Sequence, residues 1–300
     1  MHYIMAMAQT FLSSMLPSRL QFLLPGRYRS YAHPIVPVLR LSGAIGAVMP
    51  FRSGLAMSNV ATMLERAFAV PGAKAVAIVI NSPGGSAAQS HLIFKRIRSL
   101  SEEKEIPVLA FVEDAAASGG YMIACAADEI YADPASIVGS IGVVSAGFGF
   151  QELIARIGVE RRVHTAGENK AMLDPFKPEN PEEVARLKGL QRKIHEVFVD
   201  LVKTRRGEKL NDSYEDLFSG AFWVGAEAVD LGLVDGLGDI RTILRQRFGE
   251  KVQFRMIEPA RPPLLARLIG RRAVTGNSLI DPAEVVGALE ERSAWARLGL

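Results

Sequence analysis

Three short apolar segments, separated by stretches with helical periodicity, constrain the fold of this chain most strongly. The segments are IVPVLRLSG (35–43), KAVAIVINS (74–82) and PVLAFVED (107–114), and they are rich in leucine and β-branched residues and bounded by Gly, Pro or Asp. Between them, residues 58–69 and 87–100 place apolar side chains three and four positions apart, as an amphipathic helix does. This alternation predicts an α/β core with a mainly parallel sheet buried on both faces.

Composition excludes several classes of protein. The chain has 300 residues, of which 49% are hydrophobic and 22% charged, so it can form a substantial folded core. Its formal net charge is +3 and the basic residues are scattered, which argues against a nucleic-acid partner. Cys125 is the single cysteine and lies among apolar residues, which favours a buried structural thiol. No Cys/His cluster has metal-ligand spacing, so we expect neither a structural zinc nor another cofactor.

The two ends of the chain differ in composition from the central domain, which we place at residues 35–258. Residues 1–18 carry no Lys, Arg, Asp or Glu, yet their apolar content is thin for a spanning helix, and no basic residues precede them as in a secretory signal. The N-terminal arm, residues 1–34, fits a membrane-interfacial helix or a packing arm, and a poorly ordered leader is equally compatible. Residues 259–300 contain prolines and a short basic amphipathic piece, and we interpret them as a C-terminal helical extension.

Two glycine-containing turns follow the predicted strands. NSPGGS (81–86) lies between a strand and a helix, where backbone N–H groups could form an oxyanion hole, although P-G-G is also an ordinary turn. AAASGGY (115–121) repeats this arrangement one unit later, with Ser118 opening a helix. Ser118 is either a simple helix N-cap or a nucleophile in the positive field of a helix end.

A nucleophilic serine needs a base, and two residue types are candidates. None of the five histidines has triad spacing: His91 and His195 are interpreted as surface residues, and His164, at the end of the apparent strand GVERRVH (158–164), is only a distant candidate. A free lysine, with a pKa of about 10.4, becomes a useful base only in apolar surroundings. Lys170 in GENKAMLDPF (167–176) has such neighbours, although a solvated loop lysine fits the composition too.

Taken together, five motifs resemble the signal peptide peptidase A (SppA) family of serine–lysine peptidases. In chain order they are INSPGGS (80–86), AAASGGYMIACAAD (115–128), ADPASIVGSIGV (132–143), GENKAMLDPF (167–176) and FWVGAEAVDLGLVDGLG (222–238). Their order and spacing match one catalytic unit of that family, with residues 35–258 as the peptidase domain. The resemblance implies the α/β fold of ClpP and the crotonases, built from repeated β-β-α units with a mainly parallel sheet.

The resemblance also implies a role for five residues. Ser118 would be the nucleophile and Lys170 the general base, with the Ser140 hydroxyl orienting the lysine. Gly85 and Gly119 match the donors of the oxyanion hole. Attack of Ser118 on a peptide carbonyl would give an acyl-enzyme, which water then hydrolyses.

Assembly, substrate and location are implied in the same way. Relatives with a single catalytic unit form homo-oligomeric rings in which adjacent subunits share each site. Their substrates are unfolded or apolar peptides, including cleaved signal peptides. Many relatives carry an evident N-terminal membrane anchor, whereas this chain has only the marginal stretch described above, so we expect a membrane-associated or cytoplasmic protein.

Two other classes of function remain open. A crotonase-like acyl-CoA enzyme would share the fold, but the lysine motif has no role in its chemistry. A catalytically silent scaffold of the same fold is the second alternative, and the intact set of Ser118, Lys170 and glycines argues against it.

Overall fold

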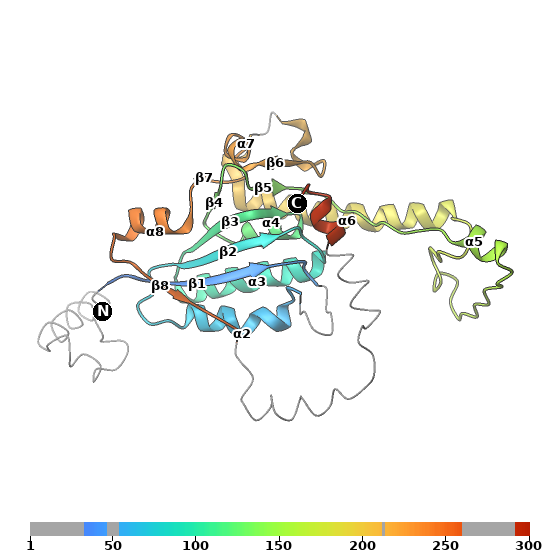
Figure 1. The fold of residues 1–300 in the computed structure, drawn as a ribbon, viewed down its shortest axis with the longest axis horizontal. Coiled ribbons are helices and arrows are strands. Elements are labelled where there is room, and N and C mark those ends of the chain that lie inside the picture. The colour runs from blue at the N-terminus through green and yellow to red at the C-terminus, as the bar shows by residue number, and fades with distance from the viewer. Residues whose placement is uncertain (1–32, 47–53, 212–213, 260–291) are drawn as a thin grey trace, which may run out of the picture.

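The computed structural model describes residues 33–46, 54–211, 214–259 and 292–300, and its centre is one eight-stranded sheet (Figure 1). The strand order is β6-β5-β3-β2-β1-β8, with β4 beside β3 and β7 beside β4. The strands are β1 (Ile35–Ser42), β2 (Val76–Ser82), β3 (Val108–Ala117), β4 (Glu129–Ala132), β5 (Ile137–Gly139), β6 (Phe222–Val224), β7 (Gly236–Leu237) and β8 (Gln253–Met256).

The pairing is parallel throughout the recorded ladders except between β5 and β6, which run antiparallel. The helices are α2 (Met57–Phe68), α3 (Ala87–Lys104), α4 (Gly119–Ala124), α5 (Gln151–Arg156), α6 (Pro181–Arg206), α7 (Gly225–Asp230) and α8 (Ile240–Phe248), with 3-10 turns η3 (Gly207–Lys209) and η4 (Glu215–Phe218). The predicted α/β fold with a mainly parallel sheet is therefore confirmed.

Both faces of the central strands are buried, as their nearly continuous apolar sequences predict. Alternate residues of β2 illustrate this: Ile78 belongs to the larger core cluster with Leu64 of α2 and Ile93 of α3, whereas Val79 belongs to a second cluster with Leu244 of α8. The sheet is therefore covered on one face by α2, α3 and α4 and partly covered on the other face by α8.

Helix α6 begins and ends where its sequence predicts. The Asn180 side-chain oxygen accepts a hydrogen bond from the Glu182 N–H at 2.9 Å, and Pro181 occupies the first turn, where no N–H is needed. The buried residues of α6 are all in its C-terminal third, at Phe198, Leu201, Val202 and Arg206. That third packs on the core, and the rest of the helix extends away from it (Figure 1).

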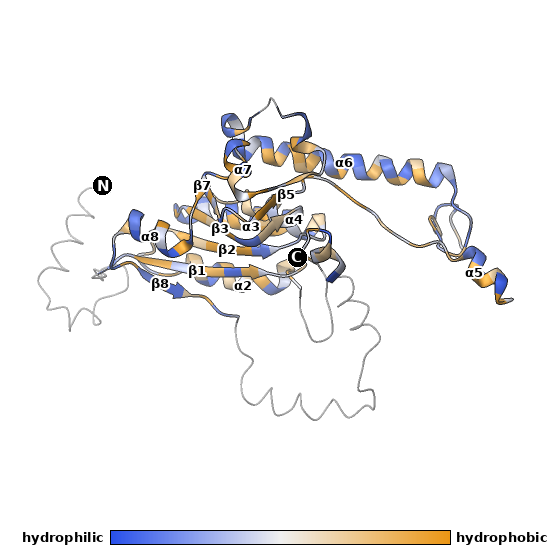
Figure 2. Ribbon diagram, turned by 45° about the horizontal axis from the view of Figure 1, so that its top comes forward, coloured by the Kyte–Doolittle hydropathy of each residue, from blue (hydrophilic) through white to orange (hydrophobic). Residues whose placement is uncertain are grey.

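The projecting part of the chain, residues 143–197, comprises the segment after β5, α5, a connecting segment and most of α6, and we call it the arm. Figure 2 shows stretches of hydrophobic residues, coloured orange, along the arm. Many of its large apolar side chains are exposed: Val144, Phe148, Leu153, Ile157, Val159, Leu190, Ile194 and Val197. Phe148 is 80% exposed. A concentration of exposed apolar surface of this kind marks a site of interaction.

The predicted strand at 158–164 is wrong, because these residues form no regular element. They lie in the arm, where no strand of the sheet is recorded beside them, so their backbone has no ladder to join.

The predicted terminal segments are only partly described. Residues 1–32 of the N-terminal arm and 260–291 of the C-terminal extension lie outside the described residues, whereas residues 292–296 are helical. None of the described helices combines the length and the apolar composition needed to span a lipid bilayer.

Candidate active site

Ser118 occupies a strained turn between β3 and α4. Its backbone has φ 51° and ψ −119°, in the left-handed half of conformational space that a residue with a side chain rarely adopts. Such conformations cost about 1–3 kcal/mol and cluster at functional sites. The Ser118 N–H donates to the Gly139 carbonyl at 2.8 Å, and its carbonyl accepts from the Met122 N–H at 3.0 Å. The turn is thus held firmly by its backbone.

The Ser118 side chain is not a helix cap. Ser118 stands at the N-cap position of α4, but its hydroxyl makes no capping hydrogen bond and none with any other described residue. The residue is half-buried, so a hydroxyl without a protein partner is presented at the end of a strand. This is the geometry of a nucleophile on a sharp strand-to-helix turn.

Glycines surround Ser118 because the neighbouring backbones approach too closely for side chains. A Cβ atom on Gly84 would lie 2.8 Å from Ser118 Cβ, and one on Gly119 would lie 2.3 Å from Ser90 Oγ. A Cβ on Gly120 would lie 2.7 Å from the Ser82 carbonyl oxygen. The glycines of both turns thereby allow the ends of β2 and β3 to meet at the serine.

Two backbone N–H groups near Ser118 have no recorded partner among the described residues. Gly85 and Ile45 form a parallel β-bridge, and the residues on either side of Gly85 make its hydrogen bonds. Ile45 N–H donates to Gly84 O and Ser86 N–H donates to Ile45 O, both at 2.8 Å. That pattern leaves the Gly85 N–H directed away from Ile45. The Gly119 N–H lies in the first turn of α4, where helical N–H groups have no partner within the helix. These are the two predicted oxyanion donors.

Ser140 leaves the sheet beside Ser118. The two serines directly follow Ala117 and Gly139, which are register partners in the parallel pair β3–β5. Ser140 also has a left-handed backbone, with φ 53°, and its N–H donates to the Ala221 carbonyl at 2.7 Å. Four of the five predicted site residues therefore lie at the carboxyl edge of neighbouring strands.

Lys170 does not lie with the other four in a single chain. It is exposed in the segment between α5 and α6, and its side chain has no recorded hydrogen bond or ion pair with a described residue. That segment and α5 lie at the far end of the arm, well away from β3 and α4 in both views (Figures 1 and 2).

The three candidate histidines, His91, His164 and His195, differ in their exposure and contacts. His164 is exposed. Partial burial, together with the charge of Lys95, lowers the pKa of His91. His195, interpreted from the sequence as a surface residue, is half-buried like His91. Its Nε2 lies 3.0 Å from the Ile141 carbonyl oxygen, to which it must donate because a carbonyl only accepts. His195 thus ties the segment after Ser140 to α6, and its place in a charged helix concealed this contact.

Cys125 is a buried free thiol, as predicted. Burial raises its pKa to about 12, so the thiol stays protonated and unreactive at neutral pH. Among the described residues, no group of three His, Cys, Asp or Glu side chains could hold a metal ion.

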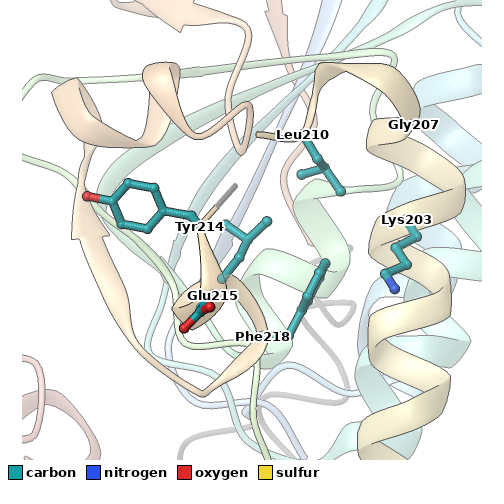
Figure 3. Close-up of a pocket in the computed structure, with 7 residues that line it drawn as sticks. Lys203, Gly207, Leu210, Tyr214, Glu215 and Phe218 are labelled. Carbon is teal, nitrogen blue, oxygen red and sulfur yellow. The ribbon is translucent and has the colours of Figure 1, made fainter. Parts of the chain in front are cut away.

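Two cavities adjoin α6 at different points along its length. The larger, of about 550 Å³, lies by its C-terminal end, where Lys203 Nζ is 5.2 Å from the centre of the Phe218 ring (Figure 3). It contains none of the predicted site residues. The second, of about 510 Å³, is lined by Gly142 and Val143, directly after the Ser140 turn, and by α6 residues that include His195. Only the second cavity adjoins the candidate site.

Comparison with known proteins gives several relatives. The chain is 53% identical over 294 residues to Na(+)/H(+) antiporter NhaA of Brucella abortus, a match covering 95% of this chain and 39% of that protein. It is 36% identical over 168 residues to the chloroplastic serine protease SPPA of Arabidopsis thaliana, covering 56% of this chain and 24% of that protein. The chain therefore spans less than half the length of these relatives.

A solved structure is also similar. A mutant of the 1510-N membrane-bound stomatin-specific protease of Pyrococcus horikoshii, in complex with a substrate peptide, aligns with 81% of this chain and 99% of its own. The TM-score is 0.48 and the sequence identity 19%.

The family match covers the candidate site in part. The description of peptidase family S49 matches residues 101–252, half of the chain, and this range includes Ser118, Ser140 and Lys170. The family resemblance predicted from the sequence is confirmed. The chain belongs to peptidase family S49.

Proposed function

We propose that this protein is a serine endopeptidase that hydrolyses unfolded or apolar peptides with Ser118 as nucleophile and Lys170 as general base. The observation that carries the proposal is the strained Ser118 turn, which packs against Gly84 and whose hydroxyl, like the N–H groups of Gly85 and Gly119, has no partner among the described residues. A nucleophile next to preorganised donors is the arrangement that acyl transfer requires.

The proposed reaction has two stages. The neutral Lys170 amine takes the proton of the Ser118 hydroxyl as its Oγ attacks the peptide carbonyl, and the oxyanion accepts hydrogen bonds from the Gly85 and Gly119 N–H groups. The tetrahedral intermediate collapses when the leaving amine takes that proton from Lys170. Water then attacks the acyl-enzyme with the same base and releases the second product. Ser140 would hydrogen-bond the lysine and orient it.

The proposed site is shared between two chains. A lysine serves as a base near neutral pH only when burial favours its neutral form, and Lys170 is exposed in one chain. The arm can supply the missing cover, because residues 181–197 of α6 extend about 25 Å and many large apolar side chains of the arm are exposed. Docked on a neighbour, the arm would carry Lys170 to that neighbour's Ser118, and repetition of this head-to-tail contact would close a ring.

The proposed substrates include cleaved signal peptides, and the proposed place of action is a membrane. A relative in Enterococcus faecium, 31% identical over 180 residues, bears the name signal peptide peptidase SppA, which supports the first statement. The extensive similarity to part of a protein named as an antiporter supports the second. Extended peptides could pair with the glycine-rich strand ends near Ser118, where backbone groups are accessible.

A fluorophosphonate probe tests the function directly. The probe is expected to label the assembled wild-type protein on Ser118 and to leave Ser118→Ala unlabelled, as read by intact mass and peptide mapping. Ser58→Ala, which removes an exposed hydroxyl on α2, is the matched control and should label normally. Labelling that persists in Ser118→Ala would contradict the proposal, and turnover of acyl-CoA thioesters without peptide cleavage would favour a crotonase-like enzyme.

Gly85→Ala is expected to reduce kcat for peptide cleavage about 10²-fold, the usual effect of losing an oxyanion donor. Gly85 has φ +143°, and an added Cβ would lie 2.2 Å from the Ile45 carbonyl oxygen, so the N–H must move. The control is Gly236→Ala, because the Cβ it adds meets only the Tyr131 ring, at 3.5 Å. An unchanged kcat in a folded Gly85→Ala protein would remove Gly85 from the mechanism.

A further inference from the structure

We infer that the cavity between the Ser140 turn and α6 is a subsite that binds a carboxylate of the peptide substrate close to the bond that is cut. This inference rests on the proposed peptidase function and specifies the substrates of that same site. Three observations carry it: the position of the cavity, the charge on its wall and the contact that fixes its shape.

The cavity lies within reach of a peptide bound at Ser118. Its wall begins at Gly142, and Gly139, three residues earlier, accepts the Ser118 N–H hydrogen bond. Three residues of chain span at most about 11 Å, and an extended substrate advances about 3.3 Å per residue. A side chain or terminus two to four residues from the scissile bond can therefore enter the cavity.

The helical wall of the cavity is basic. Lys188, Arg192 and His195 line it from α6, at spacings of four and three residues that place them on one face of the helix. No Asp or Glu lines the cavity. Neither Lys188 nor Arg192 has an ion-pair partner within the part of the chain that the structure describes, so their charges are available to a ligand.

The shape and chemistry of the wall suit a carboxylate. Arg192 offers a planar fork that can hold both carboxylate oxygens, and Lys188 adds a second positive charge one helical turn away. The hydrogen bond from His195 to the Ile141 carbonyl holds the opposite wall, residues 141–143, in place against α6. The subsite would therefore be largely formed before substrate arrives.

The same helix provides a matched control. Lys193 is exposed and follows Arg192 directly, about 100° around the helix, so it does not line the cavity. Lys188→Glu/Arg192→Glu reverses the charge of the wall, whereas Lys193→Glu changes the charge of α6 at a neighbouring position.

The test compares three otherwise identical fluorogenic peptides. The first has Glu three residues from the scissile bond and an amidated C-terminus, the second has Gln at that position and the same amide, and the third has Gln and a free C-terminal carboxylate three residues beyond the bond. The assembled wild-type protein is expected to cleave a carboxylate peptide about 1.5- to 5-fold more efficiently in kcat/KM than the Gln amide, and the preference should shrink at high salt. The first and third peptides separate a side-chain carboxylate from a C-terminal one.

The variants decide whether the cavity causes the preference. Lys188→Glu/Arg192→Glu is expected to favour the uncharged peptide, whereas Lys193→Glu should keep the wild-type order. The neutral variant Lys188→Gln/Arg192→Gln, which perturbs the helix less, should lose the preference without reversing it. Equal kcat/KM for all three peptides, or a preference that survives charge reversal, overturns the subsite.

A binding experiment keeps this test independent of catalysis. Fluorescein-labelled versions of the three peptides are titrated with assembled Ser118→Ala protein, and the dissociation constants are read from fluorescence anisotropy. An about 1.5- to 5-fold tighter Kd for a carboxylate peptide, which is what a partly exposed charge pair gives, supports the subsite even if the wild type cleaves none of them. Equal Kd values overturn the subsite. The peptidase proposal is then tested by the probe labelling alone.

Discussion

A mixture of two inactive variants, Ser118→Ala and Lys170→Ala, is expected to regain about one quarter of the wild-type peptidase activity. Each variant alone should lose activity about 10⁴-fold or more, since nucleophile and base act as a unit. In a randomly mixed ring, a site is intact when its serine comes from a Lys170→Ala chain and its lysine from a Ser118→Ala chain, which occurs at about one site in four. The measurement is peptide cleavage by co-expressed chains, with light scattering to confirm assembly.

The control for this complementation comes from the same segment of the arm. Lys177 is exposed seven residues after Lys170, and Lys177→Ala should retain full activity alone and in mixtures. In the proposed assembly, Lys170 on the arm of one chain completes the site at Ser118 in the core of its neighbour. If both groups of a site came from one chain, the mixture could not regain activity. An inactive mixture that still forms the full assembly, or an active monomer, would refute the shared site.

Asp235→Asn is expected to lower the free energy of unfolding by about 3–5 kcal/mol, the usual effect of breaking a buried ion pair. The Asp235 carboxylate lies 2.7 Å from Arg206 Nη1 and 2.5 Å from Lys209 Nζ, and it accepts the Ile130 N–H at 2.7 Å. The Arg206 side chain is 2% exposed, and its Nη2 already lacks a hydrogen-bond partner among the described residues. Removing the carboxylate charge would leave this guanidinium buried without its counter-ion.

The pH dependence of this effect has a definite sign. Burial alone would raise the pKa of Asp235, but the hydrogen bonds from Arg206 and Lys209 outweigh it and hold the pKa below its usual value. A carboxyl whose pKa is lower in the folded state stabilises the fold above its unfolded pKa of about 3.9. That stability is lost as pH falls through the lower folded pKa. Wild type should therefore lose part of its advantage over Asp235→Asn below about pH 4.

Urea unfolding at fixed protein concentration, repeated between pH 7 and pH 3, measures both parts of this prediction. Asp230→Asn is the control, because Asp230 is exposed at the end of α7 and should change stability by less than about 0.5 kcal/mol. A loss below 1 kcal/mol for Asp235→Asn at pH 7 would show that water or a rearranged side chain replaces the ion pair.

The sequence predicted the central elements well because their patterns are local. The strand expected at 35–43 is observed at Ile35–Ser42, and the helix expected at 87–100 is observed at Ala87–Lys104. The strand expected at 107–114 continues to Ala117, because Ala115, Ala116 and Ala117 pair with β5. Alanines carry no strong strand signal, so only the tertiary partner determines this extension.

The candidate site was predictable where motifs fix the backbone, and less so where contacts are distant. The glycines around Ser118 follow from close approaches that the two turns require. The contact of His195 with Ile141 spans 54 residues, and no spacing in the sequence indicates it. The apolar neighbours of Lys170 suggested burial, yet within one chain the lysine is exposed, since its surroundings depend on what covers the arm.

The bare arm also bears on how the protein behaves after synthesis. A newly folded chain presents Phe148 and its apolar neighbours to water until another surface covers them. When the protein is scarce, such a chain would bind unrelated proteins through this surface more often than it would meet another copy of itself. Production in bursts, or close together at one location, would therefore favour correct assembly over loss to aggregates.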